Sequence, residues 1–212
     1  MITTILFDFD GVIVETESQY DDFYDKLSEE LNLAIPNFAA QIKGMQLKEV
    51  LHLKFPFLSE ATKQKIIERT IAFDLQMDYP LVAGVMDFID SLKKNNFTIG
   101  LVTSSMKEKM DIAMTKSGIR HLFDAVVMGD EISKGKPDPM CYLTAAHKLH
   151  KKPSECIVFE DSMAGIESAI AAGMKVVGVA TTLSQQELSA KVEHIIPDFL
   201  NRTIESLIEK DN

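Results

Sequence analysis

The sequence predicts an α/β fold, with a Rossmann-like core of parallel strands and a second unit made of helices alone. Two patterns in the 212 residues lead to this expectation. Short apolar segments rich in β-branched residues alternate with helical segments, as in βαβ units whose parallel strands are covered by helices on both faces. A purely helical stretch interrupts this alternation after the first strand. We therefore expect residues 1–15 and 81–212 to form the core, and residues 16–80 to form an inserted helical domain.

Five segments have the composition of buried strands. Each is short and apolar, and each is bounded by turn residues or by a helical pattern. They span residues 3–9, 98–103, 123–128, 156–159 and 175–179. The inserted stretch divides into four predicted helices, at residues 16–31, 38–43, 47–54 and 59–77.

Several helix starts carry a recognisable signal. In a capping box, a serine or threonine is followed three residues later by glutamate or glutamine, and the two side chains satisfy free amides of the first turn. This pattern begins at Thr16, Ser105 and Ser184. Asp138 precedes Pro139, which suits an N-cap acid followed by proline at the first helical position. These signals predict loops that join the carboxyl ends of strands to helices.

Composition and charge limit the classes of partner. The formal net charge is −10 and no run is rich in Lys or Arg, so the overall field repels nucleic acid. Cys141 and Cys156 have neither pairing nor metal-binding spacing, and we expect buried thiols in a reducing compartment. No leader pattern or membrane-length apolar segment is present. We therefore expect a cytoplasmic monomer without a nucleic-acid or membrane partner.

Polar residues follow the predicted strands at their carboxyl ends, where open α/β sheets bind ligands. The first strand ends in two acids, the second in three hydroxyl residues and the fourth in two acids, and the loop after the third carries a lysine. In that order they are Asp8 and Asp10; Thr103, Ser104 and Ser105; Glu160 and Asp161; and Lys136. Four carboxylates at one rim repel one another unless a cation lies among them. An all-oxygen set favours Mg²⁺, and no Cys/His cluster favours zinc.

The segments DFDGVIVETE, VTSS, GKPDP and VFEDSMAGIESAIAAGM resemble the four signature motifs of the haloacid dehalogenase superfamily, in order and in spacing. The chain is most similar to the subgroup that contains β-phosphoglucomutase and small sugar-phosphate phosphatases. The resemblance covers nearly the whole sequence. It implies that the inserted helices form a cap that closes over the site, and that the substrate is a small phosphorylated metabolite.

The resemblance also implies a role for each motif residue. Asp8 is expected to be the nucleophile that forms an aspartyl phosphate, and Asp10 the general acid/base. Thr103 is expected to bind the phosphoryl group and Lys136 to steady nucleophile and phosphate. The implied Mg²⁺ ligands are Asp8, Asp10, Glu160 and Asp161. A crowded acidic site is further expected to bring the pKa of Asp10 towards the operating pH.

The same residues argue for or against other activities of the superfamily. Dehalogenases lack the second aspartate and phosphonatases have a small residue there, so Asp10 argues against both. Leu47 and Tyr20 stand where mutases of this type carry an arginine and a histidine, which favours a phosphatase. Lys43 or Lys48 can supply a displaced cation, so a phosphosugar mutase remains the first alternative. A noncatalytic binding module is the second, although all the motif residues are present.

Substrate contacts are expected from the motif loops and from the inserted helices. The candidates are Ser104, Ser105, Tyr20, Lys43, Gln46 and Lys48. Purely structural roles are the alternative: Asp8 and Asp10 could form a solvated turn, and Asp161 could belong to an ordinary helix cap. The five histidines are scattered without ligand spacing, and we expect packing or surface positions for them.

Overall fold

The computed structural model describes residues 1–42 and 45–208, and its centre is a six-stranded sheet in the order β3-β2-β1-β4-β5-β6. All neighbouring strands are parallel. Their bounds are Thr4–Phe7, Thr98–Val102, Ala125–Val127, Cys156–Glu160, Lys175–Val179 and His194–Ile196. Four of the five predicted segments contain one of these strands, and the fifth, residues 156–159, is one residue shorter than the strand Cys156–Glu160. The last strand was not predicted, because it begins with His194 and has only two apolar residues, too few to show a pattern.

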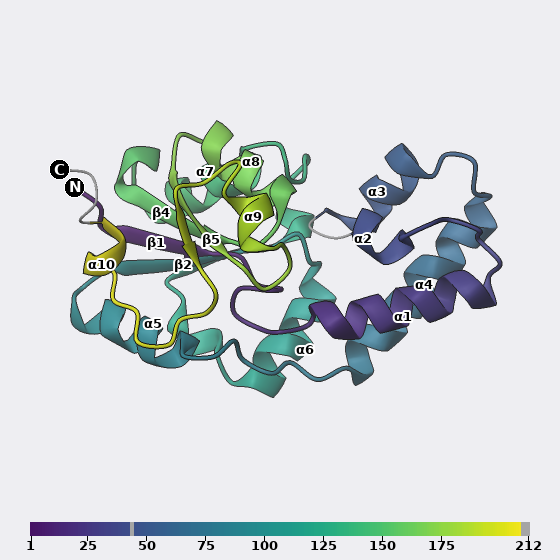
Figure 1. Cartoon of the computed structure of the whole chain (residues 1–212), viewed down its shortest axis with the longest axis horizontal. Coiled ribbons are helices and arrows are strands. Elements are labelled where there is room, and N and C mark those ends of the chain that lie inside the picture. The colour runs from purple at the N-terminus through teal and green to yellow at the C-terminus, as the bar shows by residue number, and fades with distance from the viewer. Residues whose placement is uncertain (43–44, 209–212) are drawn as a thin grey trace.

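Helices cover both faces of this sheet (Figure 1). α5 (Val85–Lys94) and α6 (Lys107–Ser117) lie on one side, and α7 (Met140–Lys148) and α8 (Met163–Ala171) lie on the other. Successive side chains of β1 alternate between the two layers, since Ile5 and Phe7 belong to one apolar cluster and Leu6 to the second. The short helices α9 and α10 span Gln185–Leu188 and Glu205–Ile208. The predicted α/β architecture is confirmed.

Four further helices lie together to one side of the sheet and its covering helices (Figure 1). They are α1 (Glu17–Glu30), α2 (Phe38–Ile42), α3 (Leu47–Lys54) and α4 (Glu60–Gln76). The chain leaves and re-enters the sheet layer along paired segments. The amide of Glu15 donates to the carbonyl of Pro80 at 2.8 Å, and the amide of Val82 donates to that of Ile13 at 3.0 Å. Both connections to the four helices therefore run side by side.

The capping predictions divide into correct and wrong ones. The box at Ser184 is confirmed, with the Ser184 hydroxyl accepting from the amide of Glu187 and the Glu187 carboxylate accepting in return. The boxes at Thr16 and Ser105 are wrong. Neither hydroxyl caps a helix, and each lies instead at the carboxylate of Asp10, to which it donates.

The start of α7 differs slightly from the prediction. The helix begins at Met140 rather than at Pro139, so Asp138 stands one residue further out than an N-cap. Its carboxylate still accepts from the amide of Met140 at 3.0 Å. The acid therefore satisfies a free amide of the first turn from the preceding loop.

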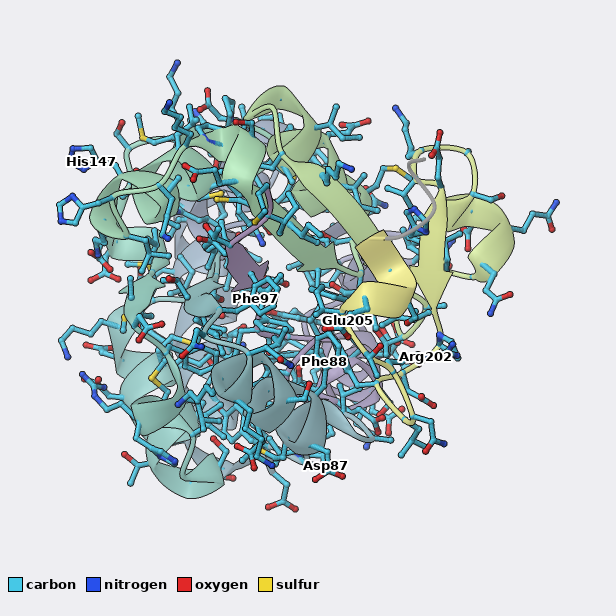
Figure 2. All side chains as sticks on the ribbon, turned by 90° about the vertical axis from the view of Figure 1, so that its left-hand side faces the viewer. Asp87, Phe88, Phe97, His147, Arg202 and Glu205 are labelled. Carbon is cyan, nitrogen blue, oxygen red and sulfur yellow. The ribbon has the colours of Figure 1, made fainter. Side chains whose placement is uncertain are left out.

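Both cysteines are buried and unpaired, as predicted. His147 is exposed and lies at the periphery of the molecule, as Figure 2 shows. Within the described ranges, no helix combines the length and the apolar composition needed to cross a bilayer.

An aromatic cluster joins the central strands to α5. The rings of Phe7 on β1 and Phe159 on β4 stack with centroids 5.2 Å apart, and Phe88 of α5 packs edge-on against Phe159 at 5.4 Å. Phe199, from the segment after β6, contacts all three rings. Close ring packing on the α5 side of the sheet thus holds the strands that carry the site in place.

Replacing Phe88 tests this packing. Phe88 is 1% exposed, and Phe88→Ala is expected to lower the free energy of unfolding by about 3–5 kcal/mol, because it removes buried apolar area and leaves a cavity. Asp87→Ala is the matched control, since Asp87 is the exposed neighbour on the same helix (Figure 2). The control should cost less than about 1 kcal/mol. Urea unfolding measures both, and equal losses would contradict the expectation.

Candidate active site

Lys136 is the centre of a buried charge cluster at the carboxyl ends of β1 and β4. Its ammonium donates to Oδ1 of Asp8 at 2.7 Å and to Oε1 of Glu160 at 2.6 Å. The side chain is 1% exposed, although it comes from the loop after β3. An ammonium in such a setting is stabilised only by close, hydrogen-bonded carboxylates. The structure therefore brings together two strand ends and a distant loop, as the sequence predicted.

Glu160 is fully buried, and both of its oxygens are hydrogen-bonded. Oε1 accepts from Lys136 and from the hydroxyl of Tyr142 at 2.8 Å. Oε2 accepts from the amides of Asp161 and Ser162 and from the Ser162 hydroxyl. Saturated in this way, the Glu160 carboxylate is suited to holding Lys136 in place.

Asp161 carries the remaining carboxylate of the cluster. Its Oδ2 accepts from the hydroxyl of Thr182, and no lysine or arginine among the described residues pairs with it. One oxygen each of Asp8, Glu160 and Asp161 lies within 4.8 Å of the other two. Oδ2 of Asp8 and Oδ1 of Asp161 receive no hydrogen bond from the described part of the chain.

These three carboxylates fit a hard divalent cation. Lys136 neutralises only one of the three negative charges, so the formal charge of the group matches that of one Mg²⁺. The donors are all oxygen atoms, which Mg²⁺ prefers. Asp8 and Asp161 are the members with oxygens still available as ligands. Three of the four expected ligands therefore fit the expected metal, whereas the Asp10 carboxylate is not part of this group.

Burial sets the protonation of these acids. It raises the pKa of Asp8 to about 7, helped by the charge of Glu160 and opposed by Lys136. Burial also raises the pKa of Asp161 well above its usual range, and the charges of Glu160 and Asp8 add to the effect. The pKa of Lys136 is raised because its two carboxylate partners outweigh the cost of burial. A bound divalent cation would favour the ionised acids.

Two glycines leave room for the carboxylates. Gly11 has φ +77°, and a Cβ there would overlap the carboxylate of Asp161. Gly165, in the first turn of α8, lies against the carboxylate of Glu160, where a Cβ would also overlap. A side chain at either position would therefore displace a carboxylate of the cluster.

Asp10 occupies a different environment from Asp8. Its Oδ1 accepts from the Thr16 hydroxyl at 2.7 Å. Its Oδ2 accepts from the Ser105 hydroxyl at 3.1 Å and from the ammonium of Lys109 at 2.6 Å. The carboxylate thus receives donors from the first strand's own loop and from the segment after β2.

The expected pKa of Asp10 is wrong for the structure described. Burial raises the pKa, but the charge and hydrogen bond of Lys109 and the two hydroxyl donors outweigh burial. The net result is a pKa below the ordinary value of 3.8. The sequence shows the acids of the rim, but it does not show that Lys109 lies beside Asp10.

The loop after β2 supplies hydroxyls and backbone to the same edge. Thr103 is 2% exposed, and its Oγ1 accepts from the amide of Ser105 at 3.0 Å. That bond leaves the Thr103 hydroxyl proton to donate elsewhere. The backbone of Ser104 passes so close to Gly129 that a Cβ there would overlap its carbonyl. The loops after β2 and β3 are therefore in contact.

The predicted substrate contacts on the helices occupy different places. Gln46 precedes α3, and its Nε2 donates to the carbonyl of Gly129 at 2.6 Å, so it bridges to a loop of the sheet layer. Tyr20 is buried in α1 and donates to Oδ1 of Asp74 on α4 at 2.6 Å. Lys48 is exposed, and Lys43 lies outside the described residues.

The contributors to the site that the sequence did not reveal include Lys109, Tyr142 and Thr182. Lys109 follows Ser105, the predicted helix start, by four residues, which is about one helical turn. That spacing was the available signal. Tyr142 and Thr182 had none, because their roles depend on which loops the fold brings together.

The chain is similar to known proteins in sequence and in structure. The model of the family "Haloacid dehalogenase-like hydrolase" matches residues 5–179. The validoxylamine A 7′-phosphate phosphatase of Streptomyces hygroscopicus subsp. limoneus is 29% identical over 193 residues, which cover 89% of this chain and 91% of the relative. The β-phosphoglucomutase of Bacillus subtilis is 31% identical over 188 residues, with 82% of each chain covered. A crystal structure of an HAD hydrolase, family IA, variant 3, from Entamoeba histolytica superposes with TM-score 0.85 at 26% identity, covering 98% of both chains.

The raised pKa of Asp8 predicts a pH-dependent stability. Without a divalent cation the folded chain keeps a proton on Asp8 that the unfolded chain loses, so this group's contribution to the free energy of unfolding falls between pH 3.8 and about 7. Urea unfolding in EDTA at about pH 5 and about pH 8 measures this contribution as the difference in the free energy of unfolding between the wild type and Asp8→Asn. That difference should be smaller at the higher pH.

Added Mg²⁺ should reverse the trend. Because ligands bind in their ionised form, Mg²⁺ should raise the free energy of unfolding more at the higher pH than at the lower one. Stabilisation of the same size at both values, or none at either, would contradict the assignment of these acids as ligands.

Proposed function

Because this chain belongs to the haloacid dehalogenase-like hydrolase family, we propose that it is a Mg²⁺-dependent phosphatase that hydrolyses a small phosphorylated metabolite through an aspartyl phosphate on Asp8. The class of enzyme, a hydrolase of phosphoric monoesters, follows from the family and from the phosphatase among its relatives. The observation that carries the mechanism is Lys136, which lies between Asp8 and Glu160 with Asp161 beside them.

Asp8 is the nucleophile in this proposal. A carboxylate oxygen of Asp8 bonds to phosphorus while the bond to the leaving oxygen breaks in line, and water then displaces Asp8. Lys136 orients the carboxylate through Oδ1, which leaves Oδ2 to attack or to bind the metal. A bound Mg²⁺ supplies neutralisation of phosphoryl charge. The Thr103 hydroxyl donates to a phosphoryl oxygen.

Asp10 is the general acid and base. It gives a proton to the leaving oxygen and later takes one from the attacking water. In the arrangement described, both of its oxygens accept hydrogen bonds from Thr16, Ser105 and Lys109. From the residues that the structure describes, Oδ1 accepts only the Thr16 hydroxyl, so a carboxylate with about four acceptor positions keeps one there for proton transfer.

We propose that residues 16–80 form a cap and that residues 1–15 and 81–212 form the catalytic core. The paired connections near residues 13–15 and 80–82 support a hinge, because both segments that join the cap to the core lie side by side there. The contact from Gln46 to Gly129 supports closure over the loops after β2 and β3. Closing such a cap excludes water and completes the site.

The substrate class we infer is a phosphorylated sugar or a sugar-like compound. One relative is named for a phosphatase of validoxylamine A 7′-phosphate and the other for a phosphoglucomutase. A phosphosugar mutase is therefore the second candidate. Leu47 and Tyr20 argue against it, because neither supplies a cation for a second phosphate.

Asp8→Asn tests the nucleophile. The wild type should release phosphate from p-nitrophenyl phosphate only with Mg²⁺, and the variant should lose at least about 10³-fold in kcat, because an amide cannot form the covalent intermediate. Asp90→Asn, an exposed change on α5, should retain wild-type kcat. Full turnover by Asp8→Asn refutes the nucleophile, and a wild type without activity supports a noncatalytic module.

The product of β-glucose 1-phosphate separates phosphatase from mutase. With Mg²⁺ and the glucose bisphosphate activator, the phosphatase should release inorganic phosphate, because water reaches the phosphoenzyme. Phosphate and glucose 6-phosphate are assayed in the same reaction. Glucose 6-phosphate formed faster than free phosphate would establish the mutase instead.

A further inference from the structure

Lys109 is a buried lysine whose role neither the family motifs nor the metal cluster explains. It lies in the first turn of α6 and is 9% exposed. Its ammonium donates to Oδ2 of Asp10 at 2.6 Å. Among the described residues, the other lysine of comparable burial outside the charge cluster is Lys63 on α4, which pairs with the exposed Glu60 one helical turn away. Lys109 instead reaches across the fold to a residue 99 positions earlier.

Aromatic faces enclose the same ammonium. It lies 4.8 Å from the ring centroid of Tyr20 and 5.9 Å from that of Phe9. Both rings attract a cation through their electron-rich faces. Phe9 comes from the loop of the nucleophile, whereas Tyr20 comes from α1 of the inserted helices. The ammonium thus contacts both units of the molecule.

Tyr20 is itself held by the inserted helices. Its hydroxyl donates to Oδ1 of Asp74 on α4 at 2.6 Å, and its ring lies 5.6 Å from that of Phe73. The order of contacts is therefore Asp74, Tyr20, Lys109, Asp10. Helices α1 and α4 are connected in this way to the carboxylate that the proposed function assigns to proton transfer.

Stability alone is a weak reason for such a lysine. Burying an ammonium costs free energy that its partners must offset, and an apolar side chain of similar size is often as stable. Thr16 and Ser105 already donate to Asp10. The additional donor adds charge and a link to α1, neither of which the two hydroxyls supply.

We propose that Lys109 is a positioning residue that holds the Asp10 carboxylate in place for proton transfer, and that Tyr20 couples this arrangement to closure of the inserted helices. The proposal rests on the proposed function of Asp10. In the closed arrangement the Tyr20 ring confines the ammonium beside Asp10. When α1 moves away with the other inserted helices, the ring moves too, and the ammonium is free to leave the carboxylate.

The test compares two phosphate esters of similar shape. p-Nitrophenolate leaves readily without a proton, whereas the phenolate of phenyl phosphate depends more on the general acid. Lys109→Met should therefore lower kcat/KM for phenyl phosphate at least about tenfold more than for p-nitrophenyl phosphate, within the 10²–10⁴ that general acid catalysis supplies. A merely structural role would lower both by the same factor.

Three further variants complete the experiment. Lys109→Arg should recover most of the lost kcat/KM for phenyl phosphate, because it keeps the charge and the reach. Lys109→Gln keeps a donor without the charge, should show the same selective loss as Lys109→Met, and replaces that variant if it fails to fold. Lys107→Met is the matched control, since Lys107 is exposed on the same turn of α6 and pairs with Asp111. The control should match the wild type on both esters.

The outcomes separate this proposal from the proposed function. A wild type that hydrolyses both esters, with Lys109→Met equally active or equally reduced on both, overturns the role of Lys109 alone. A wild type that hydrolyses neither ester overturns the function on which it rests. Thermal unfolding of each variant confirms that the kinetic comparison is made between folded proteins.

Discussion

The hydrogen bonds of Lys136 to Asp8 and Glu160 are the interaction on which the rest of the site depends. Three carboxylates within 4.8 Å of one another repel strongly in a buried setting, and a single ammonium lowers that repulsion without removing it. The remaining negative charge creates the demand for a divalent cation. The same contacts orient the nucleophile, because Oδ1 of Asp8 is fixed and Oδ2 is left to react. Tyr142 and the amides after Glu160 keep this arrangement in place.

The two aspartates that follow β1 lie in opposite environments. Burial and a neighbouring acid raise the pKa of Asp8 to about 7, whereas Lys109 and two hydroxyls lower that of Asp10. A nucleophile must be ionised and a general acid must carry a proton, so the arrangement described is not yet the reactive one. A divalent cation favours ionised Asp8, and Asp10 must take up a proton before it can protonate the leaving oxygen. Pairs of acids separated in this way are typical of enzymes that assign them different roles.

Five of the six strands, the four inserted helices and the cluster around Lys136 follow from patterns that act over a few residues: apolar runs, helical periods and polar residues at strand ends. The contributors that the sequence did not reveal depend on contacts between distant segments. Thr16 and Ser105 have the spacing of capping boxes, yet both hydroxyls donate to Asp10. Ser184, with the same pattern away from the site, caps its helix as predicted. A local rule thus failed where the site recruits the side chain.

The most direct measurement is to identify the residue that carries the phosphoryl group. Enzyme quenched during turnover and treated with borohydride converts an aspartyl phosphate to homoserine, which mass spectrometry locates in the chain. The account predicts homoserine at position 8 and at no other aspartate. Modification of a different residue, or steady turnover with no modified aspartate, would contradict a covalent intermediate on Asp8.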